Sequence, residues 1–451
     1  MTAPTDEPTH VVTAFLRHRG SVLLFQRSDA VGTYQGQWGG VSGFAEGAPD
    51  EQVRVEIREE TGLEPGESVS LVRSGRPVEF EDPELEREWV VHPYLFDATS
   101  REIDLSEEHD ASEWVSPTAI LDLEDHAGDD LAVADRKTVP ELWTAYERVA
   151  PTVRSIAADD EHGAASLSLR ALEVLRDRAG LLVAERAEFG ADPDEEWDEL
   201  AELAGRLLEA RPSMAVLRNR VNRVMAETGA ATSDGVTPGA PAVLEAALSG
   251  IERAATADAE AAANASDRLE GSVMTLSRSG TVLKALRGGD PVRVYVAESR
   301  PAGEGIDVAE ELAADDEFEA PVTVHTDAAV GHVLSREDVD RVLVGADTIR
   351  SDGAVVNKTG TRTLALLADR EDVSVSVVAA TDKVSTREDV NLESGGRSAV
   401  YDGDAPIDVL NPTFDVTPAD CVDEFVTERG RLEADDVADV AAELRDLEAW
   451  R

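Results

Sequence analysis

Apolar positions recur with two different periods along the chain, and the change of period predicts separate regions. Short β-rich runs at 11–16 and 21–26 surround a glycine-containing turn, which is the pattern of a hairpin. From 140 to 228, leucines recur instead at steps of three and four residues, which is typical of amphipathic helices in a bundle. We therefore expect a first domain at 1–140 and a helical subdomain at 141–270.

In the remainder of the chain, apolar runs alternate with segments of helical character. The runs lie at 272–276, 292–298, 322–325, 339–344 and 373–379. A turn or a helix follows each of them, and this alternation is typical of a parallel, Rossmann-like sheet. The expected fold class is α/β, with a Rossmann-like domain at 271–451.

The charge of the chain narrows the range of partners. Aspartate and glutamate number 93 against 42 lysines and arginines, which gives a formal net charge of −51 spread along the sequence. Nucleic acid needs a basic face, so we expect no direct contact with it. The chain is 42% hydrophobic, which separates it from disordered acidic proteins. Such a charge indicates adaptation to high salt and a halophilic source.

The cysteine content and the apolar runs bear on the compartment. Cys421 is the single cysteine, so an intramolecular disulfide and a cysteine-based zinc cluster are excluded. No apolar run approaches the roughly 20 residues of a membrane span, and the first residues lack the features of a signal peptide. We expect a soluble, cytoplasmic protein without a membrane partner.

Three carboxylates are predicted to share one face of a helix in the first domain. Pro49 suits the first turn and Gly62 the end of this helix, so Glu56, Glu59 and Glu60 stand at i, i+3 and i+4. Like charges at this spacing repel one another unless a cation neutralises them. Carboxylate oxygens suit Mg²⁺ or Mn²⁺. The alternative is a solvated acidic helix face.

The stretch from 342 to 361 has the pattern of a ligand site. Asp347 comes just after an apolar run, at the end of a parallel strand where open α/β sheets bind ligands. Asn357 and Lys358 precede the apolar helix TLALLAD, so a lysine and backbone N–H groups are expected at a helix N-terminus, which suits a phosphate. The alternative is an ordinary strand–turn–helix connection with a surface lysine.

Polar side chains also follow two other predicted strands of this region. Ser277, Arg278 and Ser279 come after the first strand and precede an apolar helix, and Arg300 comes after the second. Helix capping would explain each cluster taken alone. Because all of them lie at carboxyl ends of strands, we expect one anion-binding crevice.

The acidic helix resembles the signature box of Nudix hydrolases. That box ends in Arg-Glu-apolar-any-Glu-Glu-any-Gly-apolar, and residues 55–63 read VEIREETGL. The flanking WGGVSGF and EHDASEWVSP also resemble this family. The resemblance implies an N-terminal α/β/α sandwich with a mixed sheet, which hydrolyses a nucleoside diphosphate linked to another group. It makes Glu59 and Glu60 metal ligands and Glu56 a ligand or base.

This box departs from the family pattern in two ways. Val55 replaces the family arginine, and the box is shorter than usual at its start, where the family glutamate has no clear counterpart. Glu46 or Glu51 would have to substitute for it. The alternative to hydrolysis is therefore a Nudix fold that serves only for binding or as a scaffold.

Five motifs in order resemble a second family. They read ARPSMAVLRN, VMTLSRSGTV, ESRPAGEGIDVAEEL, VGADTIRSDGAVVNKTGT and NPTFDVTP. This family joins the alpha, beta and delta regulatory subunits of initiation factor 2B with isomerases of methylthioribose 1-phosphate and ribose 1,5-bisphosphate. The resemblance covers about residues 150–435. It implies a symmetric homodimer and a pocket for a sugar phosphate or nucleotide effector, with Arg211 of the first motif among the ligand-binding residues.

One substitution decides between the branches of this family. In the isomerases, a cysteine and the aspartate of the Gly-Ala-Asp motif form the acid–base pair; here Asp347 matches, but Ser277 stands in the cysteine position. A hydroxyl is a far weaker proton donor than a thiol, whose pKa is about 8.5, so we expect isomerase activity to be severely impaired.

The leading hypothesis is therefore a Nudix-type, metal-dependent hydrolase fused to a regulatory domain that binds a phosphorylated metabolite. Two alternatives stay open. One is a sugar-phosphate isomerase that tolerates serine, and the other is a non-catalytic binding protein of translation with initiation factor 2 as its partner.

Overall fold

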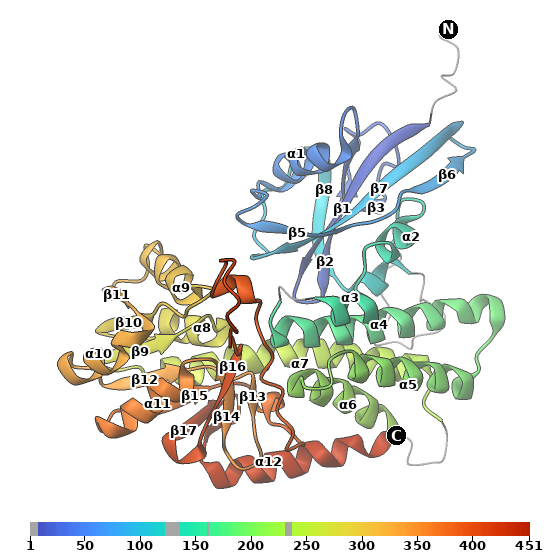
Figure 1. Ribbon diagram of the computed structural model, residues 1–451. Helices are drawn as coiled ribbons and strands as arrows, with labels where there is room; N and C mark the ends of the chain where they lie inside the picture. Colours follow the sequence, from blue (N-terminus) through green and yellow to red (C-terminus); the bar gives the residue numbers. More distant parts are fainter. Residues whose placement is uncertain (1–7, 122–135, 160–161, 231–236) are drawn as a thin grey trace. The chain divides into compact units, whose positions relative to one another are not determined.

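The computed structural model describes residues 8–121, 136–159, 162–230 and 237–451 (Figure 1). The chain forms two compact units. The first comprises Met1–Glu161, Leu169–Ala210 and Glu227–Ile251. The second comprises His162–Ser168, Arg211–Ala226 and Glu252–Arg451. Both units take residues from the helical region, and the domain boundaries expected at 140 and 270 stay a prediction.

The first unit is built on a mixed, eight-stranded sheet with the central order β3-β2-β1-β7-β5. Its strands are β1 Thr9–His18, β2 Ser21–Arg27, β3 Trp38–Gly39, β4 Val41–Phe44, β5 Val69–Ser74, β6 Val78–Asp82, β7 Arg87–Ala98 and β8 His109–Val115. Strands β1 and β2 form the predicted antiparallel hairpin, whereas β1 and β7 are parallel. The N-terminal mixed sheet expected from the sequence is confirmed.

Helix α1 (Pro49–Thr61) covers one face of this sheet (Figure 1). It starts at Pro49, and it ends where Gly62 adopts a left-handed conformation with φ 70 and its N–H donates to the carbonyl of Arg58. Val53 and Ile57 are buried in the same apolar cluster as alternate residues of β1. The short helix α2 (Leu142–Glu147) packs with the other face, which completes an α/β/α sandwich.

Buried ion pairs join the sheet of the first unit to its helices, which include α3 Val153–Ala158, α5 Pro193–Ala210 and parts of α4 Ala164–Phe189 and α7 Ala240–Ser266. Arg17 Nε lies 2.7 Å from Asp97 Oδ1, and Arg17 Nη1 lies 2.9 Å from Glu173 Oε2. Arg170 Nη2 lies 3.0 Å from Asp97 Oδ2. Burial alone would raise the pKa of Asp97, but the two guanidinium groups hold it below its usual value. Helix α4 is thus attached to β1 and β7 by charge.

The second unit contains a seven-stranded sheet in the order β11-β10-β9-β12-β15-β17-β18. Its strands are β9 Ser272–Leu276, β10 Arg293–Ala297, β11 Val322–His325, β12 Arg341–Val344, β15 Ser374–Val378, β17 Glu424–Thr427 and β18 Gly430–Leu432. Only the β17–β18 pair is antiparallel. The five apolar runs predicted as strands are β9, β10, β11, β12 and β15, which confirms the Rossmann-like sheet.

Helices cover both faces of this sheet. They are α8 Gly280–Gly288, α9 Glu304–Ala313, α10 Val330–Arg336, α11 Thr361–Arg370 and α12 Ala434–Asp446. Val342 and Val344 of β12 pack with residues of α10, α11 and α12, whereas Leu343 between them packs with α8 and α9. A strand that is buried on both faces reads as a continuous apolar run, which is why the sequence pattern identified it.

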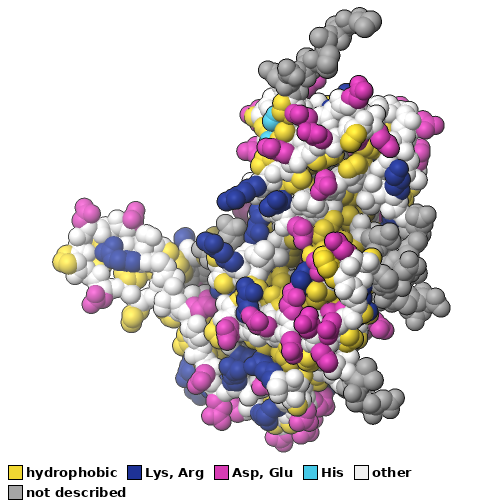
Figure 2. All heavy atoms as spheres, turned by 90° about the vertical axis from the view of Figure 1, so that its right-hand side faces the viewer, with side chains coloured by type: hydrophobic (Ala, Val, Ile, Leu, Met, Phe, Trp, Pro, Cys, Tyr) yellow, Lys and Arg dark blue, Asp and Glu magenta, His cyan; other side chains and the backbone are white. Residues whose placement is uncertain are grey.

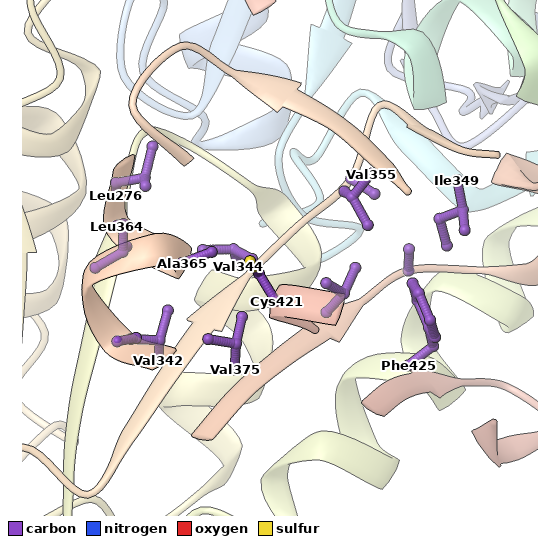
Figure 3. Packing of buried hydrophobic residues seen from close by; sticks show 14 of the residues in the cluster. Leu276, Val342, Val344, Ile349, Val355, Leu364, Ala365, Val375, Cys421 and Phe425 are labelled. Carbon is purple, nitrogen blue, oxygen red and sulfur yellow. The ribbon is translucent and has the colours of Figure 1, made fainter. Parts of the chain in front are cut away.

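The larger apolar cluster of the second unit also contains Cys421 (Figure 3). The thiol lies among Val344, Val375 and Phe425 and is 8% exposed. A smaller sheet of three strands, β13 Thr348–Ile349, β14 Val355–Lys358 and β16 Phe414–Thr417, adds Ile349 and Val355 to this cluster. Cys421 is therefore a core residue and lacks the exposure of a reactive thiol.

Helix α6 (Ala215–Ala230) contributes a buried ionic cluster to the second unit. Arg220 Nε and Arg223 Nη2 lie 3.2 and 3.0 Å from the two carboxylate oxygens of Asp382. Asn219 Nδ2 donates to the carbonyls of Asp382 and Val384, at 2.7 Å each. Burial opposes the charge of Asp382, but the two arginines hold its pKa below the usual value. The segment around Asp382 is thereby fixed to α6.

The surface carries acidic and basic side chains intermixed over the face shown in Figure 2. Within the described ranges, no helix combines the length and apolar character that crossing a membrane requires.

We predict that Asp382→Ala lowers the free energy of unfolding by about 3 kcal/mol, because the partly exposed Arg223 loses this carboxylate and the buried Arg220 keeps the more distant carboxylate of Asp258, whose Oδ2 lies 3.5 Å away. Chemical denaturation measures this loss. Asp352→Ala, which removes a solvent-exposed partner of Arg350, should cost about 1 kcal/mol or less. Equal losses in the two variants would contradict the role assigned to Asp382.

Candidate functional site

The first unit contains a cavity of about 380 Å³ beside α1. Residues of β1, β2, β4, β6 and β7 line it, together with the segments 30–34 and 139–145. Its charged lining residues are Arg27, Glu56, Glu59, Glu108 and Glu141. The cavity is therefore strongly acidic, with one guanidinium group among four carboxylates.

Two of the three predicted carboxylates face this cavity. Glu59 is exposed and Glu56 is half-buried, with Oε1 accepting from Gln52 Nε2 at 2.7 Å. Burial raises the pKa of Glu56; the Gln52 amide opposes this shift, and the charges of Glu59 and Glu108 reinforce it. A Cβ atom at Gly43 would overlap the Glu56 carboxylate, so β4 approaches this group only because residue 43 is glycine.

The third carboxylate, Glu60, is buried and is not among the lining residues. Its Oε1 accepts from the Ser42 N–H at 3.2 Å, and its Oε2 has no hydrogen-bond partner within the part of the chain that the structure describes. His109 Nε2 lies 3.5 Å away, but burial lowers the pKa of His109 to about 4, so this imidazole is neutral at pH 7. Burial raises the pKa of Glu60 well above its usual value, and the charges of Glu56 and Glu108 add to the shift.

The donor chemistry of this cluster fits a divalent cation. A buried carboxylate oxygen without a partner and three further carboxylates that repel one another are what a hard cation would stabilise. As the side chains are placed, no three His, Cys, Asp or Glu groups of the described residues converge closely enough to hold a metal ion. The carboxylates would have to turn toward a common centre.

Another part of the cavity wall is aromatic. The rings of Phe44 and Trp89 are nearly parallel, with centroids 6.3 Å apart, and Tyr34 lies 6.0 Å from Trp89. The guanidinium of Arg87 lies over the Trp89 ring, 5.0 Å from its centroid. Aromatic faces of this kind stack with planar rings such as nucleobases.

Sequence reasoning missed Arg27, Glu108 and this aromatic wall. Glu108 belongs to the segment EHDASEWVSP, so the resemblance to the Nudix family gave a signal for it. Only 4% of the residues are aromatic, and four of them line this cavity, Tyr34, Phe44, Phe80 and Trp89. Their convergence depends on strand pairing, which no local pattern encodes.

In the second unit, the carboxyl ends of the strands bring three predicted residues together. Ser277 Oγ donates to Glu304 Oε2 at 2.5 Å, and Lys358 Nζ donates to Glu304 Oε1 at 2.9 Å. Burial raises the pKa of Asp347; Lys383 and Lys358 oppose this shift, and Glu304 adds to it. Ser277, Asp347 and Lys358 thus share one cluster with Glu304 and Lys383, neither of which we predicted from the sequence.

The backbone at the ends of β9 and β10 is held in an unusual conformation. Ser277 and Ser299 have φ values of 58 and 60, in the left-handed region that non-glycine residues rarely adopt. The Ser277 N–H donates to Ser299 Oγ at 2.7 Å, and the Ser299 N–H donates to Asp327 Oδ1 at 2.8 Å. These bonds fix the direction of the Ser277 hydroxyl.

Two arginines predicted to bind an anion already have carboxylate partners. Arg278 Nη2 lies 3.1 Å from Glu311 Oε2, and Arg300 Nε lies 3.3 Å from Glu298 Oε2. Both guanidinium side chains are more than half exposed, at 54% and 67%. Their part in ligand binding stays a prediction.

The remaining predicted residues have local roles. Ser279 caps the start of α8 by accepting from a backbone N–H of its first turn. Asn357 is buried and donates to Thr361 Oγ1 at 3.0 Å. The Arg211 carbonyl accepts the N–H of Met214 in the turn before α6. Helix capping, the alternative weighed for Ser279, is thus observed.

Two N–H groups at the N-terminus of α11, where the sequence predicts a phosphate site, already donate to a carboxylate. Asp415 Oδ2 accepts the Gly360 N–H at 2.8 Å, and Asp415 Oδ1 accepts the Arg362 N–H at 3.1 Å. Because β16 pairs with β14, a carboxylate from a distant segment occupies the place proposed for a phosphate. The lysine beside this helix start is present as expected, but the helix itself is already capped.

Comparison with known proteins agrees with both resemblances. The family described as "Initiation factor 2 subunit family" matches residues 160–434, and the "NUDIX domain" matches residues 7–136. Ribose 1,5-bisphosphate isomerase of Haloferax volcanii is 32% identical over 317 residues, which cover 66% of this chain and 94% of the relative. Methylthioribose-1-phosphate isomerase of Pseudomonas putida is 32% identical over 356 residues, or 70% of this chain and 93% of the relative.

Two solved structures share the fold of the C-terminal part. Translation initiation factor eIF-2B of Pyrococcus horikoshii is 27% identical with a TM-score of 0.50, covering 62% of this chain and 94% of that protein. The 5-methylthioribose 1-phosphate isomerase of the same organism is 21% identical with a TM-score of 0.51, covering 65% and 86%. The second likeness shows the fold alone.

We predict that Gly43→Ala weakens Mn²⁺ binding about tenfold or more, because the added methyl group displaces the Glu56 carboxylate. Electron paramagnetic resonance of free Mn²⁺ during titration measures the affinity. Gly47→Ala is the matched control, since a Cβ atom at residue 47 meets open space. If Gly43→Ala binds Mn²⁺ as tightly as Gly47→Ala, the close approach of β4 does not position the metal site.

Proposed function

Because the chain belongs to the initiation factor 2 subunit family and carries an N-terminal NUDIX domain, we propose a protein with two activities. The first unit hydrolyses a nucleoside diphosphate derivative with the help of Mg²⁺ or Mn²⁺. The second unit binds a phosphorylated metabolite, a sugar phosphate or a nucleotide. We also propose that the protein is a cytoplasmic homodimer and comes from a halophilic source.

One observation carries the hydrolase proposal: carboxylates and stacked aromatic rings line the same cavity. A nucleoside diphosphate derivative has an apolar planar base at one end and a charged diphosphate at the other. Phe44, which is 52% exposed and is backed by the buried Trp89 ring, offers a stacking surface for the base, while Glu56 and Glu59 stand where a metal-bound diphosphate would lie. The two kinds of wall match the two halves of this substrate class.

Different residues that line or adjoin the cavity would bind the cation, act as the base and supply a positive charge. Glu56, Glu59 and Glu60 would hold the divalent cation, which polarises the phosphoryl oxygens and activates water when bound. Glu56 also suits the role of base, since burial brings its pKa closer to neutral. Arg27 faces the same cavity and interacts with the charges of Glu60 and Glu108. It is the one guanidinium among the described residues that line this cavity.

We expect Mg²⁺-dependent release of phosphate products from a panel of nucleotide sugars, dinucleotides and ADP-ribose at high salt. Glu56→Gln and Glu59→Gln should each lower kcat about 100-fold or more, because a neutral amide neither binds the cation nor accepts a proton. Glu64→Gln, on a half-exposed residue paired with Arg58 outside the cavity, should keep wild-type activity. Equal rates in all variants would refute hydrolysis at this site and leave a Nudix fold used for binding.

A sugar-phosphate isomerase is the second candidate function. Two relatives that are 32% identical over almost their whole length are named for such an activity, and the charges of Lys383 and Lys358 act on Asp347 in the second unit. Against turnover stands the hydroxyl of Ser277, because the single thiol of the chain, Cys421, is packed in the apolar core. We therefore favour ligand binding without rapid turnover. Association with initiation factor 2, as a non-catalytic protein, is the third candidate.

We predict that the wild-type protein turns over ribose 1,5-bisphosphate and methylthioribose 1-phosphate very slowly or not at all, and that Ser277→Cys increases the rate because a thiol exchanges protons more readily. Coupled detection of the ketose product measures the rate. Rapid wild-type turnover that disappears in Asp347→Asn would instead establish the isomerase.

A further inference from the structure

The Glu304 carboxylate accepts hydrogen bonds from two donors of the cluster in the second unit. Its Oε2 accepts from the Ser277 hydroxyl and its Oε1 accepts from the Lys358 ammonium, at 2.5 and 2.9 Å. Both charged side chains of this pair remain 28% exposed, so the ion pair is open to solvent and ligands. A ligand anion can engage both donors only if it displaces Glu304.

The fold holds Glu304 in this place through its backbone. Glu304 is the first residue of α9, where the helix dipole favours a negative charge. Gly303 before it has φ 79, and a Cβ atom at Gly305 after it would overlap the carbonyl of Ala297 at the end of β10. The first turn of α9 therefore lies directly against the sheet, and the carboxylate is aimed at the strand ends.

Lys358 does not need Glu304 for its orientation. Its ammonium lies 5.8 Å from the centroid of the Phe414 ring, and its backbone is held in the ladder between β14 and β16. Of the other cations near the strand ends, Arg278 and Arg300 are paired with their own carboxylates, and Lys383 donates to the carbonyl of Ala346. A phosphate that enters this cluster must compete with carboxylates for its donors.

We propose that Glu304 determines the ligand selectivity of this cluster, because its carboxylate competes with the phosphate group of the ligand for Ser277 and Lys358. The proposal rests on the proposed binding of a phosphorylated metabolite by the second unit. It predicts that the ionised carboxylate weakens binding of a phosphate monoester and leaves binding of an uncharged sugar unaffected. Glu304 thereby acts as a specificity residue, distinct from the residues that hold the ligand.

Isothermal titration of the full chain with inorganic phosphate, ribose 5-phosphate and ribose, at one fixed KCl concentration, tests this role. Glu304→Gln should bind phosphate and ribose 5-phosphate about tenfold tighter or more, because the negative charge that competes with the phosphate for Lys358 is absent. Binding of ribose should not change. Glu304→Ala, which lacks both acceptors, should show the same gain, and thermal melting verifies that each variant is folded.

Two controls assign the gain to this pocket. Asp307→Asn removes the same charge from an exposed position of α9 and should change affinity less than twofold. The double variant Glu304→Gln/Lys358→Met should lose the gain, since the ammonium is absent. A gain that appears equally in Asp307→Asn, or persists without Lys358, would overturn the proposal.

The outcomes also separate this inference from the proposed function. If the wild-type protein fails to bind ribose 5-phosphate and Glu304→Gln binds it, Glu304 is the competitor and the wild-type chain is not a sensor of this ligand. If the wild-type protein binds ribose 5-phosphate and neither Glu304 variant binds it more tightly, the inference is refuted while the binding function stands. Absence of binding in every variant refutes both.

Discussion

The pairing of scarce cations with abundant carboxylates is the constraint on which both candidate sites depend. The chain has 42 lysines and arginines for 93 acidic residues, so a buried arginine is readily matched, and often by more than one carboxylate. Arg17 contacts Asp97 and Glu173, while Asp382 is shared between Arg220 and Arg223. Such buried pairs stabilise the fold only when both partners are present, because an isolated buried charge is costly. These three buried or partly buried arginines, Arg17, Arg220 and Arg223, therefore stabilise the fold through their carboxylate partners.

The two candidate sites are opposite outcomes of this constraint. Around α1, the carboxylates exceed the cations, and their mutual repulsion together with burial raises the pKa values of Glu56 and Glu60. That site has an excess of negative charge, which suits a divalent cation. In the second unit, Lys358 and Ser277 are already satisfied by Glu304. In that cluster the donors already have an anionic partner, so an anionic ligand has to displace the Glu304 carboxylate from Ser277 and Lys358.

Much of the architecture is predictable from the sequence because it is encoded locally. Helix α1 begins at Pro49 and ends at Gly62 as expected, and four of the five predicted strands of the second unit, β9, β10, β12 and β15, are buried on both faces and therefore read as apolar runs. Which residues make up the two candidate sites is harder to predict from the sequence. Glu304 reaches Lys358 across 54 residues, and Asp415 caps α11 from a similar distance along the chain. Hydrophobic periodicity carries no information on which distant carboxylate completes a cluster.

The geometry around Ser277 bears on whether the second unit is built for chemistry or for binding. A left-handed backbone at a non-glycine residue costs of order 1–3 kcal/mol, and here two successive strand ends carry it, supported by hydrogen bonds through Ser299. This strain holds the 277 side chain in a fixed direction whichever residue occupies the position. With serine there, the side chain serves hydrogen bonding, since an aliphatic hydroxyl does not ionise near neutral pH. The Ser277 hydroxyl, the Lys358 ammonium and the Glu304 carboxylate support the proposed role in selective ligand binding. Proton transfer with Asp347 would need a thiol, and this cluster has a serine instead.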